Sequence, residues 1–426
     1  MGAPLADHPA DARQPGVGAH AHFPAFDGLR AIAATSVALY HTAFLAGYTI
    51  RGGWAQLLTH GDVGVTIFFL ISGFLLYRPF VSAHLGGKAP MPTGSFLWRR
   101  FLRIYPAYWF AFFGILLTVG FHDPFPSSDL RSWVTYLGLL QIYDAGRVTG
   151  GVTQTWTLGT EVSFYLFLPL YAALIRAVAR GLRRPPARVE AIGIGLLIAT
   201  SFAWRAAWIL VERHGVAPST ASAFPSTPGG VAVLAQMFWL PAFLDLFAIG
   251  MALALASASS ARPGGVGPIL GALRGFVASH PIGIWVLAAC CYWVTCFHMG
   301  LGLAFHVGFR KVLGQTCYAI VALFVVLPAV FPRDGGAIDR LLRARPVAFL
   351  GLVSYGMYLW HQACIPRAFA LLRVPQFRGK LVRVFALALP LTFSAAAASY
   401  YLVERPAMRL KDLVRPAPGG GAPPPR

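Results

Sequence analysis

The sequence of 426 residues is poor in charged side chains. Only 12% of the residues are Asp, Glu, Lys or Arg, whereas 57% are hydrophobic, and this balance argues against a soluble protein of two or three domains. The mean hydropathy of +0.62 favours one polytopic membrane unit instead. We therefore expect the core to be embedded in lipid.

Cysteine is also scarce, and its placement argues against a disulfide framework or a zinc site. The five cysteines lie in apolar stretches without an extracellular spacing pattern, so we predict reduced packing residues, no disulfide and no metal. The pair His298 and His306 has no spacing typical of metal ligands. The cysteines are Cys290, Cys291, Cys296, Cys317 and Cys364.

Acidic residues are few, with 15 against 35 basic ones, which gives a net charge of +20. The chain has no RNA- or DNA-binding motif, and its basic residues fall in loops between apolar runs. We interpret them as signals of membrane topology. Residues 1–25 contain no apolar signal core, so we predict a disordered cytoplasmic arm, followed by a transmembrane domain over 26–406 and a cytoplasmic Pro/Gly-rich tail over 407–426.

Long apolar runs predict the fold class: an all-α polytopic membrane protein with about ten transmembrane helices in one bundle. A shorter stretch at 132–143 is predicted to be re-entrant or interfacial, because an eleventh crossing would place the Arg-rich loop after 158–177 outside. With ten crossings both termini are cytoplasmic. The runs centre near 27–50, 62–83, 101–121, 158–177, 190–211, 231–257, 281–303, 312–331, 347–368 and 382–403.

Ionisable residues within these runs are the first candidates for function, because a charge in lipid is costly. Arg30 and His41 are eleven residues apart, which places them on one helix face about 16 Å apart along the axis. Arg30 can also be read as a snorkelling anchor, and His41 as a helix–helix hydrogen bond. The full set is Arg30, His41, Glu161, Arg205, Asp245 and His361.

Glu161 lies at a depth similar to that of His41, so we predict a pair in which the carboxylate orients the imidazole. His361 reaches a similar level, either in an active site or as an interfacial residue beside Trp360. Arg205 and Asp245, in adjacent runs, are expected to form a structural pair.

Three arginines, Arg99, Arg100 and Arg103, lie at the inner end of the third run. Arg100 and Arg103 point the same way because they are i,i+3 neighbours. The cluster can serve topology alone, or it can hold a cytoplasmic ligand that carries phosphate, since the planar guanidinium binds two oxygens at once.

Taken together, the motifs resemble the membrane acyltransferase-3 family of bacterial O-acyltransferases, over about Phe26 to Pro406. Six segments match the family's patterns in order. They are FDGLRAIAATSVALYH, DVGVTIFFLISGFLL, RRFLRIYPAYW, WTLGTEVSFYLFLP, VSYGMYLWH and VERP. Two departures occur: Thr157 stands where Ser is usual, and Gly159 and Thr160 replace bulkier residues. Some relatives carry an appended esterase-like domain, and we expect none here.

The resemblance implies about ten helices in a bacterial cell membrane, with an acyl group taken from cytoplasmic acyl-CoA and given to a hydroxyl of a sugar-containing acceptor. It implies that His41 is the catalytic base, that Arg30 belongs to the same motif and that Arg100 and Arg103 bind acyl-CoA. For the oxyanion we consider His361 or Tyr355 as donors. An envelope polysaccharide, a glycolipid and a natural-product glycoside are all compatible acceptors.

Two other classes stay open at this point. A transporter or flippase of a lipid-linked sugar would use buried charges as a substrate pathway. A membrane scaffold has less use for a line of polar residues across the bilayer. No inverted repeat is visible, and the arginine pair favours the enzyme that uses acyl-CoA.

Overall fold

The computed structural model describes residues 23–120, 129–144, 146–148, 150–213, 236–262, 267–299, 308–333 and 335–413. Within these ranges the chain forms helices and no strand, so the all-α fold class is confirmed. Most of the predicted N-terminal arm and C-terminal tail, residues 1–22 and 414–426, lies outside the described residues, and those two assignments stay predictions.

Ten helices of the described part are 17 residues or longer. They are α1 (Ala25–Leu45), α2 (Val63–Leu85), α3 (Thr93–Thr118), α5 (Trp156–Gly181), α6 (Pro186–Arg213), α8 (Leu244–Ser260), α10 (Pro281–Met299), α11 (Gly308–Val330), α14 (Ser354–Leu371) and α15 (Leu381–Ser399). The shorter α-helices are α4 (Leu130–Leu137), α9 (Pro268–Ser279), α12 (Ala337–Leu342), α13 (Arg345–Leu352) and α16 (Arg405–Arg409). Single turns are η1 (Gly53–Leu58), η2 (Gln141–Tyr143), η3 (Thr153–Thr155), η4 (Leu240–Phe243), the π-helical η6 (Tyr400–Glu404) and η7 (Leu410–Asp412).

Eight helical stretches among the described residues are long and apolar enough to cross a membrane, which supports a multi-pass membrane protein. They contain α2, α3, α5, α6, α8, α10, α11 and α15. The two remaining predicted runs correspond to α1 and α14. Both helices carry ionisable residues, Arg30 and His41 in α1 and His361 in α14. Two helices outside the eight candidate spans therefore hold three of the candidates for function.

Three boundaries differ from the sequence prediction. The run at 347–368 is divided into α13 and α14 by a break at Val353. The run at 231–257 begins its long helix only at Leu244, after a turn that contains Pro241, and residues 231–235 lie outside the described part. The third helix starts earlier than predicted, at Thr93, so its arginines lie within the helix.

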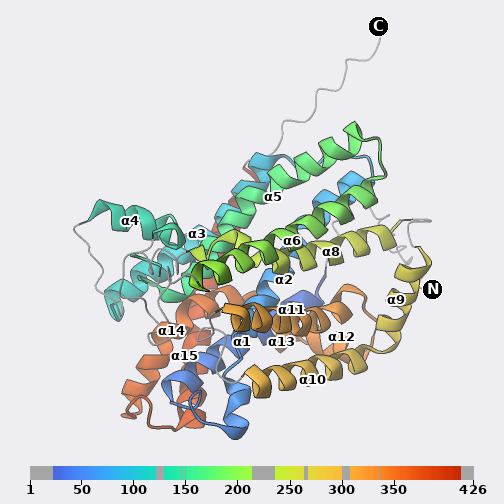
Figure 1. Cartoon of the computed structure of the whole chain (residues 1–426). Coiled ribbons are helices and arrows are strands. Elements are labelled where there is room, and N and C mark those ends of the chain that lie inside the picture. The colour runs from blue at the N-terminus through green and yellow to red at the C-terminus, as the bar shows by residue number, and fades with distance from the viewer. Residues whose placement is uncertain are drawn as a thin grey trace, which may run out of the picture.

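The stretch at 132–143 does not form a long helix. Its only α-helix, α4, has eight residues and is about 12 Å long, much shorter than the hydrocarbon core. α4 lies at one edge of the bundle, away from α9 and α10 (Figure 1). This length fits the prediction that the segment does not cross.

Close approach of α2 and α8 builds the centre of the bundle. A Cβ atom added at Gly73 would collide with the carbonyl oxygen of Phe247, and one at Gly250 would collide with that of Leu70. Two glycines on facing helices thus remove the side chains that would hold the backbones apart. α1 lies beside α2 near the middle of the bundle and also packs against α13 and α14 (Figure 1).

The predicted pair between Arg205 and Asp245 is confirmed. Nη2 of Arg205 lies 2.8 Å from Oδ2 of Asp245, and both side chains are buried. Ser201 and Gln315 donate to the other carboxylate oxygen at 3.0 and 3.1 Å. The two opposite charges thus compensate each other where α6, α8 and α11 meet. This arrangement agrees with a structural role for the pair.

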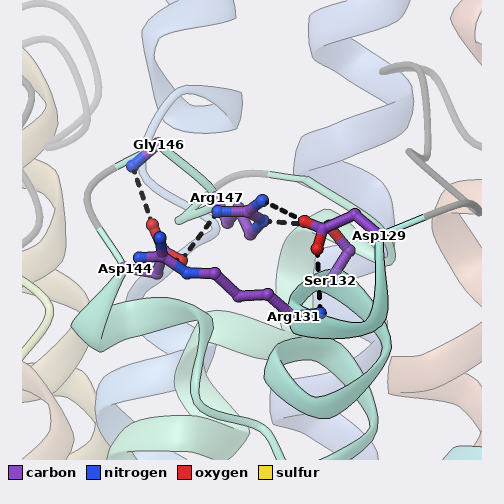
Figure 2. A network of polar contacts seen from close by, with 6 residues as sticks. All are labelled: Asp129, Arg131, Ser132, Asp144, Gly146 and Arg147. Atoms are coloured by element: carbon purple, nitrogen blue, oxygen red, sulfur yellow. Dashed lines mark hydrogen bonds and ion pairs between the residues drawn. The ribbon is translucent and has the colours of Figure 1, made fainter.

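An ion-pair network fastens the loop that leads from α4 to α5 (Figure 2). Asp129 caps α4 by accepting from the backbone N–H of Arg131 at 2.9 Å and from the hydroxyl of Ser132 at 3.0 Å. Arg147 lies between two carboxylates, 2.6 Å from Asp129 and 2.8 Å from Asp144. The Ser132 hydroxyl, the Arg131 N–H and the Arg147 guanidinium hold the pKa of Asp129 below its ordinary value of 3.8.

Replacing Gly73 by Ala is expected to destabilise the bundle. The added methyl group forces α2 away from α8, which costs about 1–3 kcal/mol. Gly195→Ala is the matched control, because Gly195 lies in α6 with nothing within 4 Å of an added Cβ. Thermal unfolding in detergent should show a lower midpoint for Gly73→Ala and an unchanged or higher midpoint for Gly195→Ala. Equal midpoints for the two variants would contradict this packing.

Arg147→Met should loosen the loop over 129–148 at neutral pH, because both carboxylates lose their shared partner. Limited proteolysis should then cleave this loop faster than in the wild type. Arg131→Met is the control: the side chain of Arg131 is 69% exposed, and exposed pairs contribute little. Because the pKa of Asp129 is lowered, its contribution persists above pH 3.8 and is lost as the pH falls through the lowered pKa. Unchanged cleavage in Arg147→Met would count against the network.

Candidate active site

Two histidines lie side by side where α1 meets α14. Nε2 of His361 is 3.3 Å from Nδ1 of His41, and the ring centroids are 4.9 Å apart. His361 is 1% exposed, whereas His41 is partly buried. The two residues were singled out separately in the sequence, and the structure brings them together.

The partners of the two rings fix which nitrogens carry hydrogen. Nδ1 of His361 lies 2.8 Å from the carbonyl oxygen of Tyr358, which can only accept, so this nitrogen donates and Nε2 carries the lone pair. Nδ1 of His41 then donates, shared between that lone pair and the carbonyl of Val37 at 3.0 Å. Nε2 of His41 is therefore a lone-pair nitrogen, and no described residue hydrogen bonds to it.

Tyr358 is itself held by the segment that opens α5. Its hydroxyl lies 2.8 Å from Oγ1 of Thr157 and donates to the carbonyl of Gln154 at 3.0 Å. Gln154 in turn donates from Nε2 to the carbonyl of Leu359 at 2.7 Å. Thr157, where the family usually has Ser, thus supplies the hydroxyl of this contact. The result is a fixed stretch of α14 directly before His361.

A cavity of about 340 Å³ lies inside the bundle, and neither histidine of the pair is among the residues that line it. One part of its wall is polar and basic, with Arg30, Arg100, Arg103 and Glu161. Tyr358 is also part of the wall, so the cavity adjoins the residue that holds His361. Apolar side chains cover much of the remainder, among them Val65, Phe68, Leu75, Leu76 and Leu158.

The predicted pair between His41 and Glu161 is not formed. Oε1 of Glu161 accepts from Ser72 at 2.5 Å and from Tyr165 at 2.8 Å. His361 occupies the position beside His41 instead. Similar depth in two helices did not imply contact, because depth does not fix the direction in which each side chain points.

Two of the arginines form ion pairs. Nη1 of Arg30 lies 2.9 Å from Asp27, which therefore does not cap the start of α1 as its position suggests. Nη1 of Arg103 lies 3.4 Å from Glu404, a residue of the π-helical turn η6 that is 1% exposed. The third-helix motif and the VERP motif thus meet in space.

Arg100 differs from both. It forms no ion pair with a described residue, and its Nε is buried without a hydrogen-bond partner there. The ring of Phe96 lies 5.9 Å from its guanidinium carbon. A partly buried cation that lines a cavity and forms no ion pair with a described residue is well suited to an anionic ligand.

Arg99 and Tyr355 are the two remaining predicted site residues, and neither is placed for its predicted role. Arg99 does not line the cavity, although it adjoins Arg100 in the sequence. Tyr355 does line it, but its hydroxyl donates to the carbonyl of Ile104 at 2.9 Å. The hydrogen on Nδ1 of His361 is likewise bound to Tyr358. Neither Tyr355 nor His361 has a donor free for an oxyanion in this arrangement.

The sequence reasoning did not assign a site role to Ser72, Tyr358 or Gln154. Each contributes a hydroxyl or an amide, and such neutral groups are inexpensive enough in a membrane helix to give no signal by themselves. Ser72 and Tyr358 lie inside matched motifs, whereas Gln154 lies two residues before one. Among the described residues, no group of three or more His, Cys, Asp or Glu lies together in a way that could hold a metal ion.

Two relatives match nearly the whole chain, and a third matches about a third of it. Peptidoglycan O-acetyltransferase OatA of Listeria monocytogenes is 24% identical over 401 residues, which cover 90% of this chain and 56% of that protein. Nodulation protein 10 of Rhizobium leguminosarum bv. viciae is 25% identical over 418 residues, covering 91% and 93%. Acyltransferase MdmB of Streptomyces mycarofaciens is 29% identical over 163 residues, covering 36% and 40%.

The chain spans just over half the length of the Listeria protein. No solved structure matches it. The family model described as an acyltransferase domain matches residues 23–403, which include all the motifs of the cavity and of the histidine pair. As its six motifs predicted, the chain therefore belongs to the acyltransferase-3 family.

Proposed function

We propose that this protein is an O-acyltransferase that moves a short acyl group, such as acetyl, from acyl-CoA to a hydroxyl of a sugar-containing acceptor of the cell envelope. The names of two relatives, a peptidoglycan O-acetyltransferase and an acyltransferase, support the reaction class. The observation that carries the proposal is the cavity. It is lined by three arginines, and its wall includes the tyrosine that holds His361 against His41.

The basic part of the cavity is the proposed donor site. Phosphate groups of coenzyme A would lie against Arg100, which lacks a carboxylate partner, with Arg30 and Arg103 nearby. A volume of about 340 Å³ lies within the range typical of small-molecule sites and would accept part of the coenzyme. The apolar wall suits the acyl-bearing arm.

His41 is the proposed general base. Its Nε2 lone pair takes the proton of the acceptor hydroxyl as the oxygen attacks the thioester carbonyl. The C–O bond of the new ester forms, the C–S bond breaks, and the proton passes to the leaving thiolate of coenzyme A. His361 fixes the tautomer of His41 that leaves Nε2 free, and Glu161 remains in the donor cavity.

The proposed topology places the basic wall of the cavity toward the cytoplasm of a bacterial cell membrane, with both termini on that side. α1 then begins inside, and His41 lies nearer the outer face than Arg30 does. This arrangement lets a cytoplasmic donor meet an acceptor that arrives from the other side. Residues 26–406 form the transferase domain, between an arm and a tail.

Substituting His41 by Ala should lower kcat by at least about 100-fold, because general-base catalysis contributes that much or more. The assay measures free coenzyme A released by purified protein from acetyl-CoA in the presence of a sugar acceptor. His298→Ala, at the exposed end of α10, is the control and should retain activity. Near-normal turnover of His41→Ala would reject the base. Wild-type protein that releases no coenzyme A would favour the transporter.

Arg100→Gln should raise the KM for acetyl-CoA by about 10- to 100-fold, since a hydrogen bond between two charged groups is lost. The KM for the acceptor should not change. Arg99→Gln is the matched control, as its side chain does not line the cavity. If both substitutions raised the KM for acetyl-CoA equally, general surface charge rather than the cavity would explain the effect.

A further inference from the structure

A second, much smaller hollow lies between the end of α3, the loop before α5 and α14. Its volume is about 20 Å³, which is room for about one water-sized group. No charged residue lines it. The residues around it are Ile115, Val119, Gly120, Gly151, Val152, Thr153, Gln154, Gln362 and Ala363.

The amide of Gln154 has a fixed orientation at this hollow. Its Nε2 donates to two backbone carbonyls of α14, at 2.7 Å to Leu359 and 3.3 Å to Tyr358. Carbonyl oxygens only accept, so the nitrogen has to face them and the assignment of the two amide atoms is settled. Oε1 of Gln154 is then buried without a hydrogen-bond partner among the described residues, in a side chain that is 4% exposed.

Gln141 shows that an unpartnered amide oxygen does not by itself make a site. It is also buried, its Nε2 donates to Thr155 at 3.0 Å, and its Oε1 has no partner among the described residues. Gln141, however, does not line the hollow. The difference is that Gln154 lines the hollow.

The hollow is linked to the histidine pair through one atom. The carbonyl oxygen of Tyr358 accepts from Nδ1 of His361 at 2.8 Å and from Nε2 of Gln154 at 3.3 Å. The two nitrogens are separated by no more than the sum of these distances. The amide nitrogen of Gln154 therefore lies close to the His361 ring, which contacts His41.

Resting on the proposed function, we propose that Gln154 binds the acceptor, with Oε1 accepting a hydrogen bond from one hydroxyl of the sugar. An amide oxygen requires a donor, and the uncharged walls favour a neutral donor over an ammonium group. The space admits one such group. Because a sugar carries several hydroxyls, one can be held here while another is presented to Nε2 of His41.

The test uses purified full-length protein, acetyl-CoA, and a panel of chitotetraose, maltotetraose and methyl glucoside. It continues with the acceptor that the wild type acetylates best and with monodeoxy derivatives of that acceptor. Gln154→Met should raise the acceptor KM roughly 3- to 10-fold and leave the KM for acetyl-CoA unchanged. In the wild type one deoxy derivative should be a poorer acceptor by a similar factor, and in Gln154→Met that penalty should disappear.

Gln141→Met is the matched control and should leave both KM values and every deoxy penalty unchanged. A purely structural role of Gln154 would lower kcat but preserve the deoxy penalties, and that result would overturn the subsite alone. If the methionine variant does not fold, Gln154→Lys keeps donors for the carbonyls of α14 and removes the acceptor, so the same comparison applies. If the wild type acetylates no sugar of the panel, the proposed function and the subsite both fail.

Discussion

The cost of an ionisable side chain in an apolar bundle is the constraint on which this structure depends. Ion pairs reduce this cost, as between Arg205 and Asp245 and between Arg103 and Glu404. The pairs also tie helices together, since each joins elements far apart in the chain. Arg100 does not follow the pattern, because it lines the cavity without an ion-pair partner among the described residues, and its Nε is buried without a hydrogen-bond partner there. A guanidinium without an ion-pair partner indicates a position where an anionic ligand would supply the missing negative charge.

The same constraint explains why motifs that are scattered in sequence meet in one place. The first-helix motif supplies Arg30, the third supplies Arg100 and Arg103, and the acidic motif supplies Glu161, all on one cavity. Glu404 of the last motif reaches Arg103 from a π-helical turn, a distortion often found at functional sites. Polar groups gather because each needs partners that lipid cannot provide.

Much of the fold could be predicted from the sequence, because hydrophobic runs report directly on helices that cross lipid. The ion pair of Arg205 with Asp245 could also be predicted, since the two residues lie in adjacent apolar runs. The partner of His41 could not. Helix depth placed both Glu161 and His361 near it, but only packing fixes which side chain points toward α1. The roles of Ser72 and Gln154 gave no signal, because neutral polar groups are common in membrane helices.

The choice of His361 rather than Glu161 as the partner of His41 has a consequence for the proposed reaction. A carboxylate beside the base would place a permanent charge in a buried position, whereas two neutral imidazoles and a backbone carbonyl place none. Charge would then arise at the pair only while His41 holds the proton of the hydroxyl. In the proposed reaction the transient imidazolium would be stabilised by the second ring and discharged when the proton reaches the thiolate. In the proposed site, fixed charge would then lie at the wall of the cavity, where phosphate could balance it, and not at the histidine pair.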